Sequence, residues 1–186
     1  MELFPAMDIG LFNGWLLITF FYLVFGVMLI IFPKTVVARL YDRSSQRGTQ
    51  KGRRVIGLIL VFLWFFLSIV TPLTDVNVVF ALGIIIYTIG LVGMVVALLD
   101  YKNTPIDQLV TSGLYRISRH PQQVTLSTSF LGVSITMGSW LSLGLIVLGL
   151  IMAHPKILAE EEACLEIYGE SYKRYMERVP RYFLFF

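Results

Sequence analysis

Four long segments without a charged residue dominate this sequence of 186 residues. They cover residues 9–32, 55–73, 76–99 and 122–153, and they account for a hydrophobic fraction of 56% and a mean hydropathy of +0.76. A helix needs about 20 apolar residues to cross the hydrocarbon core of a bilayer. Each of the first three segments is long enough for one crossing, so we expect an all-α integral membrane protein with a single domain over residues 1–186.

The fourth segment has 32 residues, which is too long for one ordinary crossing and short for two. We interpret it as a tight hairpin of two helices that turns near Gly138 and Ser139, with Trp140 as an interfacial anchor. The prediction is therefore five transmembrane helices, with a short turn at Thr74 and Asp75 between the second and third. The expected spans are 9–32, 55–73, 76–99, 122–137 and 140–154, with a loop at 100–121 and a tail at 155–186.

The distribution of basic residues supports five spans. All fifteen Lys and Arg residues fall in three segments, with seven in 34–54, three in 102–119 and five in 156–181. Five crossings place these segments on one face, which the positive-inside rule makes cytoplasmic. We therefore expect the N-terminus outside and the loop and C-terminal tail in the cytoplasm. The acidic N-terminus, with Glu2 and Asp8, does not resemble a cleaved signal.

The tail is predicted to form amphipathic helices. Pro155 is expected to open the first of them, and Gly169 to split the run in two. Apolar and aromatic residues follow a spacing of three and four, which places them on one helical face: Leu158, Leu165, Tyr168, Tyr172, Tyr175 and Val179. For this stripe alone we favour a helix that lies on the membrane surface.

The segment "GLYRISRHPQQV", residues 113–124, concentrates polar residues at the start of the fourth span. Arg116 alone is best explained by contact with lipid phosphates. His120 is more informative, because Pro121 restricts its backbone and can open the next helix, which fixes the imidazole at the mouth of the span. The only other histidine is His154, far away in sequence, and with the lone Cys164 there is no pair at metal-ligand spacing. We therefore do not expect a metal site.

Two segments taken together carry a family resemblance. "LVTSGLYRISRHP" followed, after the apolar hairpin, by "EEACLEIYGESYKRYMERVPRYF" resembles the signature of the isoprenylcysteine carboxyl methyltransferase and phospholipid methyltransferase group of integral membrane enzymes. The resemblance covers residues 104–183. It implies that S-adenosylmethionine binds from the cytosol between the loop, the last span and the tail, while a lipophilic acceptor enters from the bilayer.

The resemblance also implies roles for individual residues. Catalytic roles fall on Arg119 and Glu162, and the cofactor contacts on Tyr115, His120, Pro121, Glu161 and Glu162. Gln123 and Arg178 are expected to meet the substrate. Two positions depart from the family pattern, because Gln123 stands where a Tyr is usual and Thr125 where a Gly is frequent. Carboxylates suit the ammonium or ribose of the cofactor, and Arg119 suits an anionic acceptor.

Two other functions are compatible with the sequence. Sterol and steroid reductases that use NAD(P)H resemble the same "GLYRISRHP" segment, although they usually continue with Asn-Tyr and have more spans. A non-catalytic membrane scaffold of the same fold is the third possibility. The expected partners are the lipid bilayer and a membrane-delivered acceptor, either a prenylcysteine-like carboxylate, a lipid headgroup or a thiol. We expect no nucleic-acid partner, and the sequence leaves the oligomeric state open.

Overall fold

The computed structural model describes residues 1–3, 7–41, 51–73 and 76–183. These residues form helices joined by turns, with two isolated β-bridges and no longer strand among them. The all-α prediction is therefore confirmed for the described chain. The helices in chain order are α1 (Trp15–Ile31), α2 (Lys34–Leu40), α3 (Lys51–Val70), α4 (Val78–Asn103), the 3₁₀ helix η2 (Gly113–Arg116), α5 (Pro121–Thr136), α6 (Trp140–Tyr168) and α7 (Glu170–Arg178).

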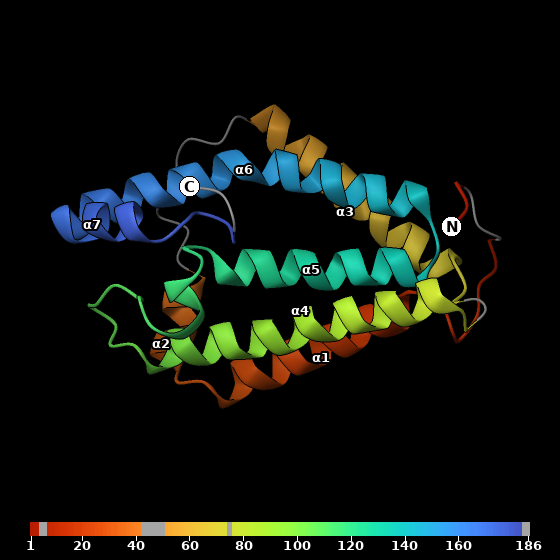
Figure 1. Ribbon diagram of the computed structural model, residues 1–186, viewed down its shortest axis with the longest axis horizontal. Helices are drawn as coiled ribbons and strands as arrows, with labels where there is room; N and C mark the ends of the chain where they lie inside the picture. The colour runs from red at the N-terminus through yellow and green to blue at the C-terminus, as the bar shows by residue number, and fades with distance from the viewer. Residues whose placement is uncertain (4–6, 42–50, 74–75, 184–186) are drawn as a thin grey trace.

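The long helices run side by side, and α5 lies between α4 and α6 (Figure 1). The short helices α2 and α7 lie at one end of this bundle together with η2, while the N-terminal segment lies at the other end (Figure 1). The loop and the tail that carry the sequence motif are therefore brought to the same end of the molecule. The short helix α2 has no counterpart in the sequence prediction.

Small residues allow α4 and α5 to approach closely. Gly83, Gly90 and Gly132 face the partner helix where a Cβ atom would have no room. At Gly132 an added Cβ would lie 2.6 Å from the Cα of Tyr87 and 2.8 Å from the carbonyl oxygen of Gly83. Helix pairs in membranes commonly associate through such small residues. This contact fixes the position of α5, which His120 precedes as the N-cap residue and Pro121 begins.

We expect Gly132→Ala to lower the stability of the protein by about 1 to 3 kcal/mol, because the added methyl group overpacks a backbone contact. Gly149→Ala in α6 is the matched control, since no atom lies within 4 Å of an added Cβ there. Thermal unfolding in detergent, followed by tryptophan fluorescence, measures the difference. Equal melting temperatures for the two variants would contradict the close α4–α5 contact.

The first helix starts later than the first predicted span. It begins at Trp15, not at Ile9, because the preceding segment pairs with the end of α3. Asn13 is buried, and its side chain donates hydrogen bonds of 2.6 Å to the carbonyl oxygens of Asp8 and Ile69. The backbone of Phe12 accepts a bond from Leu73 N, which also ends α3 before the predicted boundary at residue 73.

The hairpin between α5 and α6 is confirmed, whereas the predicted start of the tail was wrong. Gly138 adopts a φ of +63° at the turn, and Ser139 caps α6 by accepting a hydrogen bond from Ser142 N. Pro155 does not open a helix but lies inside α6, which continues to Tyr168. One proline removes a single backbone donor, and strong helix formers on both sides preserve the helix. Gly169, with a φ of +54°, separates α6 from α7 as expected.

The aromatic face of the tail packs against the protein, in contrast to the membrane-surface helix that we favoured. Tyr172, Tyr175 and Val179 form a buried cluster with Leu109 of the loop and Leu165 of α6. The hydroxyl of Tyr175 donates a hydrogen bond of 2.7 Å to the carbonyl oxygen of Tyr115. The tail therefore completes the polar end of the bundle.

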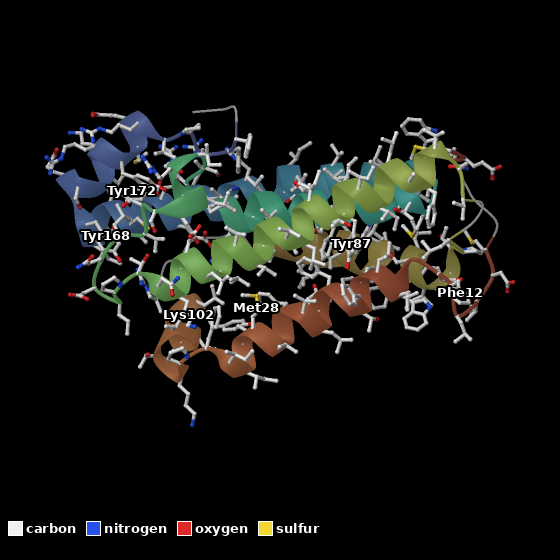
Figure 2. All side chains as sticks on the ribbon, turned by 60° about the horizontal axis from the view of Figure 1, so that its bottom comes forward. Phe12, Met28, Tyr87, Lys102, Tyr168 and Tyr172 are labelled. Carbon is white, nitrogen blue, oxygen red and sulfur yellow. The ribbon has the colours of Figure 1, made fainter. Side chains whose placement is uncertain are left out.

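The outer surface of the bundle is apolar. Large aliphatic and aromatic side chains of α1, α3, α4 and α6 are exposed, and most charged side chains gather at the end marked by Tyr168 and Tyr172 (Figure 2). Among the described helices, α4 and α6 are long and apolar enough to cross a membrane. The predicted turn at Thr74 and Asp75 lies outside the described residues, as do Arg43 and Arg47 of the first basic segment.

Candidate functional site

The loop before α5 is held at the end of α4 by Asp100. The carboxylate of Asp100 accepts a hydrogen bond of 2.8 Å from Leu114 N, the second residue of η2. Gly113 has a φ of +56° and lies so close to this carboxylate that a Cβ atom would collide with it. A glycine is therefore required at the start of the motif, both for the backbone conformation and for the close approach.

The end of the loop is joined to the tail by backbone contacts. Arg119 N donates a hydrogen bond of 3.0 Å to the carbonyl oxygen of Pro180, and Ser118 Oγ donates one of 3.0 Å to that of Arg181. Ser118 Oγ also accepts a bond from His120 N. These contacts place the Arg-His pair of the loop next to the Val-Pro-Arg segment of the tail.

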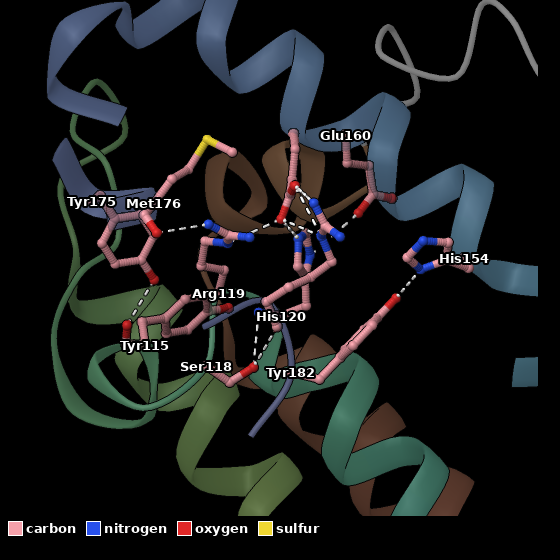
Figure 3. Close-up of polar contacts among 11 residues, drawn as sticks. Tyr115, Ser118, Arg119, His120, His154, Glu160, Tyr175, Met176 and Tyr182 are labelled. Carbon is pink, nitrogen blue, oxygen red and sulfur yellow. Dashed lines mark hydrogen bonds and ion pairs between the residues drawn. The ribbon is translucent and has the colours of Figure 1, made fainter. Parts of the chain in front are cut away.

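Glu161 of α6 is the centre of the ionic contacts. Its partners Arg119 and His120 are labelled in Figure 3. The Glu161 carboxylate lies 3.0 Å from Arg119 Nε, 3.2 Å from His120 Nε2 and 2.8 Å from Arg181 Nη2. The side chains of Glu161 and Arg119 are almost completely buried. Arg119 Nη1 donates a further bond of 3.0 Å to the carbonyl oxygen of Met176, whereas Arg119 Nε meets Glu161 as an ion pair without an aligned hydrogen bond. One carboxylate thus holds the loop, α6 and the tail together.

The charge of Glu161 is stabilised by these partners. Burial alone would raise the pKa of its carboxyl group. The hydrogen bonds from His120 and Arg181, together with the positive charge of Arg119, outweigh burial and lower this pKa to about 2. The group is therefore a carboxylate at neutral pH and remains able to hold all three bases.

A cavity of about 400 Å³ opens beside this cluster, between the loop, α2, α6 and α7. Its lining combines aromatic rings with charged side chains, including Glu160, Lys156 and Arg39. The Glu160 carboxylate lies 3.5 Å from Lys156 Nζ and 3.9 Å from His120 Nδ1, and its side chain is 34% exposed. Arg39 Nη2 donates a bond of 2.7 Å to the carbonyl oxygen of Gln108. The cavity therefore offers a carboxylate, cations and aromatic faces to a polar ligand.

Five of the predicted site residues line this cavity, namely Tyr115, Arg119, His120, Pro121 and Gln123. Glu161 joins them through its ionic contacts. The structure does not bring Glu162 or Arg178 to the site, because both side chains are exposed and neither lines the cavity.

Sequence reasoning missed three residues of the site, which are Arg39, Glu160 and Arg181. The run of three glutamates contained a signal for Glu160, because consecutive helical residues point about 100° apart and at least one of three neighbouring acids must face the protein. The Val-Pro-Arg motif contained the signal for Arg181. Arg39 lies on the unpredicted helix α2, and no motif marked it. Among the described residues, no group of His, Cys, Asp and Glu is arranged to hold a metal ion.

A second cavity of about 510 Å³ lies between α5 and α6. Aliphatic side chains such as Leu131, Leu150 and Ile151 form most of its wall, and His154 and Tyr182 form its polar end. Gln123 and Ile157 line both cavities. A polar cavity and an apolar cavity therefore meet at these two residues.

Comparison with known proteins identifies one family. A family model described as phospholipid methyltransferase matches residues 53–171, from α3 to the first turn of α7. The matched region includes the whole loop, α5 and α6, and it ends before Arg181. No curated protein matches the chain.

Proposed function

The chain belongs to the phospholipid methyltransferase family, and we propose that it transfers a methyl group from S-adenosylmethionine to a lipophilic acceptor. The observation that carries the proposal is the pair of cavities that share Gln123 and Ile157. The polar cavity suits a charged donor from the cytosol, and the apolar cavity suits an acceptor from the bilayer. A scaffold would need neither.

The residues of the polar cavity fit S-adenosylmethionine. Its volume of about 400 Å³ is that of a small-molecule site. Glu160 suits the ammonium group or the ribose hydroxyls, because its carboxylate is in the lining and only partly engaged by Lys156. The aromatic side chains Tyr168 and Tyr172 offer faces to a cationic sulfur or an adenine ring. Because the Glu161 carboxylate can only accept, His120 donates to it through Nε2, and Nδ1 of the neutral imidazole is left to accept a hydrogen bond from the ligand.

When bound, S-adenosylmethionine supplies an electrophilic methyl group on a positively charged sulfur. The protein has to align donor and acceptor and keep water out, and such positioning accounts for much of the acceleration of a reaction of this kind. Arg119 contributes as a positioning residue, because its guanidinium group is occupied by Glu161 and by Met176. The tail helps to keep water out, because its side chains Tyr172 and Tyr175 are buried and form part of the cavity wall.

We infer five membrane spans with the cytosol at the end that carries α2, η2 and α7. The sorting of the fifteen basic residues supports this orientation, as does the gathering of charged side chains at that end (Figure 2). Three spans are short, namely α1, α5 and the apolar part of α3 (Val55–Val70). Short spans are accommodated by local thinning of the bilayer or by association with neighbouring helices.

Single-cysteine labelling tests this topology. On a Cys164→Ser background, Asp8→Cys is expected to react with a membrane-impermeant maleimide added to intact cells. Lys173→Cys, at a position of α7 that is also exposed to solvent, is expected to react only after the cells are made permeable. Reaction of both positions from the same side would contradict five spans.

Gln123→Tyr tests the arrangement of two cavities. Gln123 lines both cavities, and the tyrosine side chain is larger than that of glutamine. We expect the substitution to change the rate of methyl transfer several-fold, while the dissociation constant of S-adenosylmethionine stays within about twofold of the wild-type value. Radiolabelled methyl transfer into an organic extract of native membranes measures the rate. Leu148→Tyr is the control, since this exposed residue of α6 lines neither cavity. A loss of cofactor binding in Gln123→Tyr without any change at the acceptor would contradict the assignment.

A further inference from the structure

The apolar cavity ends at a hydrogen-bonded pair of side chains that the proposed function leaves unassigned. His154 Nδ1 of α6 and Tyr182 Oη of the tail are 2.8 Å apart, although 28 positions separate them in sequence. Both line the cavity. Figure 3 shows Tyr182 reaching from the tail toward His154, beside the loop that carries His120.

The position of Tyr182 is fixed by the ionic cluster. Its neighbour Arg181 binds Glu161 through the side chain and accepts a bond from Ser118 through the backbone. The cluster that shapes the polar cavity therefore also sets the tyrosine at the edge of the apolar one. Burial, more than the opposing effect of Arg181, raises the pKa of the Tyr182 phenol above its usual value, so the phenol carries its proton at neutral pH.

The wall of the apolar cavity offers hydrogen bonds but no formal charge. Among the described residues that line it, none is Asp, Glu, Lys or Arg. The hydroxyls of Ser127 and Thr128 donate to carbonyl oxygens of their own helix, those of Gln123 and Val124. A carboxylate or an ammonium group in this cavity would lose its hydration without gaining a counter-charge, which is costly. A headgroup that is uncharged when it enters fits this wall better.

We propose that the apolar cavity takes an acceptor whose headgroup is an uncharged weak acid, a thiol or a phenol, on an apolar chain, and that the Tyr182–His154 pair takes its proton. This proposal rests on the proposed function and narrows its acceptor. Thiols and phenols have ordinary pKa values of about 8.5 to 10, so they are neutral at pH 7 but must lose a proton to accept a methyl group.

The acceptor sulfur or oxygen forms a bond to the methyl carbon, and the bond from that carbon to the sulfonium breaks, leaving its electron pair on the donor sulfur. The acceptor proton passes to Tyr182 Oη, while the proton of Tyr182 moves to His154 Nδ1, which accepts in one of the two imidazole tautomers. The imidazolium then releases its proton to the cytosolic side.

Two probes with the same alkyl chain and different headgroups test the proposal. Purified protein in nanodiscs is given radiolabelled S-adenosylmethionine and either 1-dodecanethiol or dodecanoate, which share one alkyl chain. The wild type is expected to methylate the thiol at least about tenfold faster than the carboxylate, because a proton-accepting pair typically contributes 100-fold or more. Tyr182→Phe and His154→Gln are each expected to lower kcat for the thiol by about tenfold or more, with a smaller change in KM. Tyr41→Phe, which replaces an exposed tyrosine of the cytosolic end, is expected to behave as wild type.

Cofactor binding, measured on the same samples, distinguishes failure of the proposed acceptor class from failure of the proposed methyl transfer. Protein that binds S-adenosylmethionine but methylates dodecanoate as fast as dodecanethiol, or methylates neither, overturns the acceptor class. Full thiol activity in both Tyr182→Phe and His154→Gln overturns the role of the pair. Absence of S-adenosylmethionine binding overturns the proposed function, and this inference with it.

Discussion

Glu161→Gln is expected to lower the affinity for S-adenosylmethionine by about 100-fold or more. The substitution removes the charge that compensates Arg119, whose side chain is almost completely buried. Breaking a buried ion pair by removing one partner typically costs about 3 to 5 kcal/mol, and every 1.4 kcal/mol corresponds to a factor of about ten in an equilibrium constant. The substitution weakens the contact between the loop, α6 and the tail, and these segments form much of the wall of the polar cavity. Calorimetric titration in nanodiscs measures the affinity.

Glu162→Gln is the matched control for this prediction. The two glutamates are neighbours on α6, and the same change in charge is made at an exposed side chain outside the cavity. Its affinity is expected to stay within about twofold of the wild type. If folded Glu161→Gln protein binds the cofactor as tightly as Glu162→Gln, the ionic cluster does not shape the binding site.

His120→Ala is expected to weaken cofactor binding by roughly 5- to 150-fold. The imidazole is partly buried in the cavity lining, with Nε2 held by Glu161 and Nδ1 directed toward the side of Glu160. Removing a hydrogen-bonding partner from such a site typically costs about 1 to 3 kcal/mol. The same titration measures the effect, and His120→Gln, which keeps a polar side chain, is expected to recover part of the loss.

Arg116→Ala gives the comparison within the same loop. Arg116 is exposed and does not line the cavity, so we expect its replacement to leave cofactor affinity unchanged. Equal affinities for His120→Ala and Arg116→Ala would mean that the histidine serves the loop and not the ligand.

The fold was predictable where a single physical signal dominated. Long uncharged segments predicted helices, and Gly138 predicted the turn of the hairpin because glycine readily adopts a positive φ. The start of α1 was not predictable, since hydropathy alone cannot distinguish an apolar helix from an apolar strand-like segment. The buried Asn13 decides the matter through contacts 56 positions away in sequence. The prediction for Pro155 was wrong because proline's preference for a helix start is outweighed by the helix-forming residues on both sides, which continue α6 through it.

The sequence predicted that the loop and the tail form the site together, but it did not predict which glutamate contacts the basic residues of the loop. The resemblance implied that the Arg-His-Pro loop and the glutamates of the tail would converge on the cofactor, and the structure adds that Arg119 and His120 contact one of these glutamates directly. Which glutamate points inward depends on the rotation of α6, and a helix advances about 100° per residue, so an error of one position exchanges a buried acid for an exposed one. The structure selects Glu161 as the hub and Glu160 for the cavity. The position of the two arginines was not predictable either. Arg178 is the last residue of α7 and is exposed, whereas Arg181 follows the helix and contacts Glu161.

Binding of the methyl donor to the unmodified protein is the most direct test of the central claim. Purified protein in nanodiscs is titrated calorimetrically with S-adenosylmethionine, with its demethylated product S-adenosylhomocysteine and with NADPH, and folding is checked by thermal unfolding. We predict saturable binding of the first two ligands at one site per chain and no heat of binding with NADPH. Folded protein that binds NADPH, or that binds neither S-adenosyl ligand, would contradict the claim that this cavity serves methyl transfer.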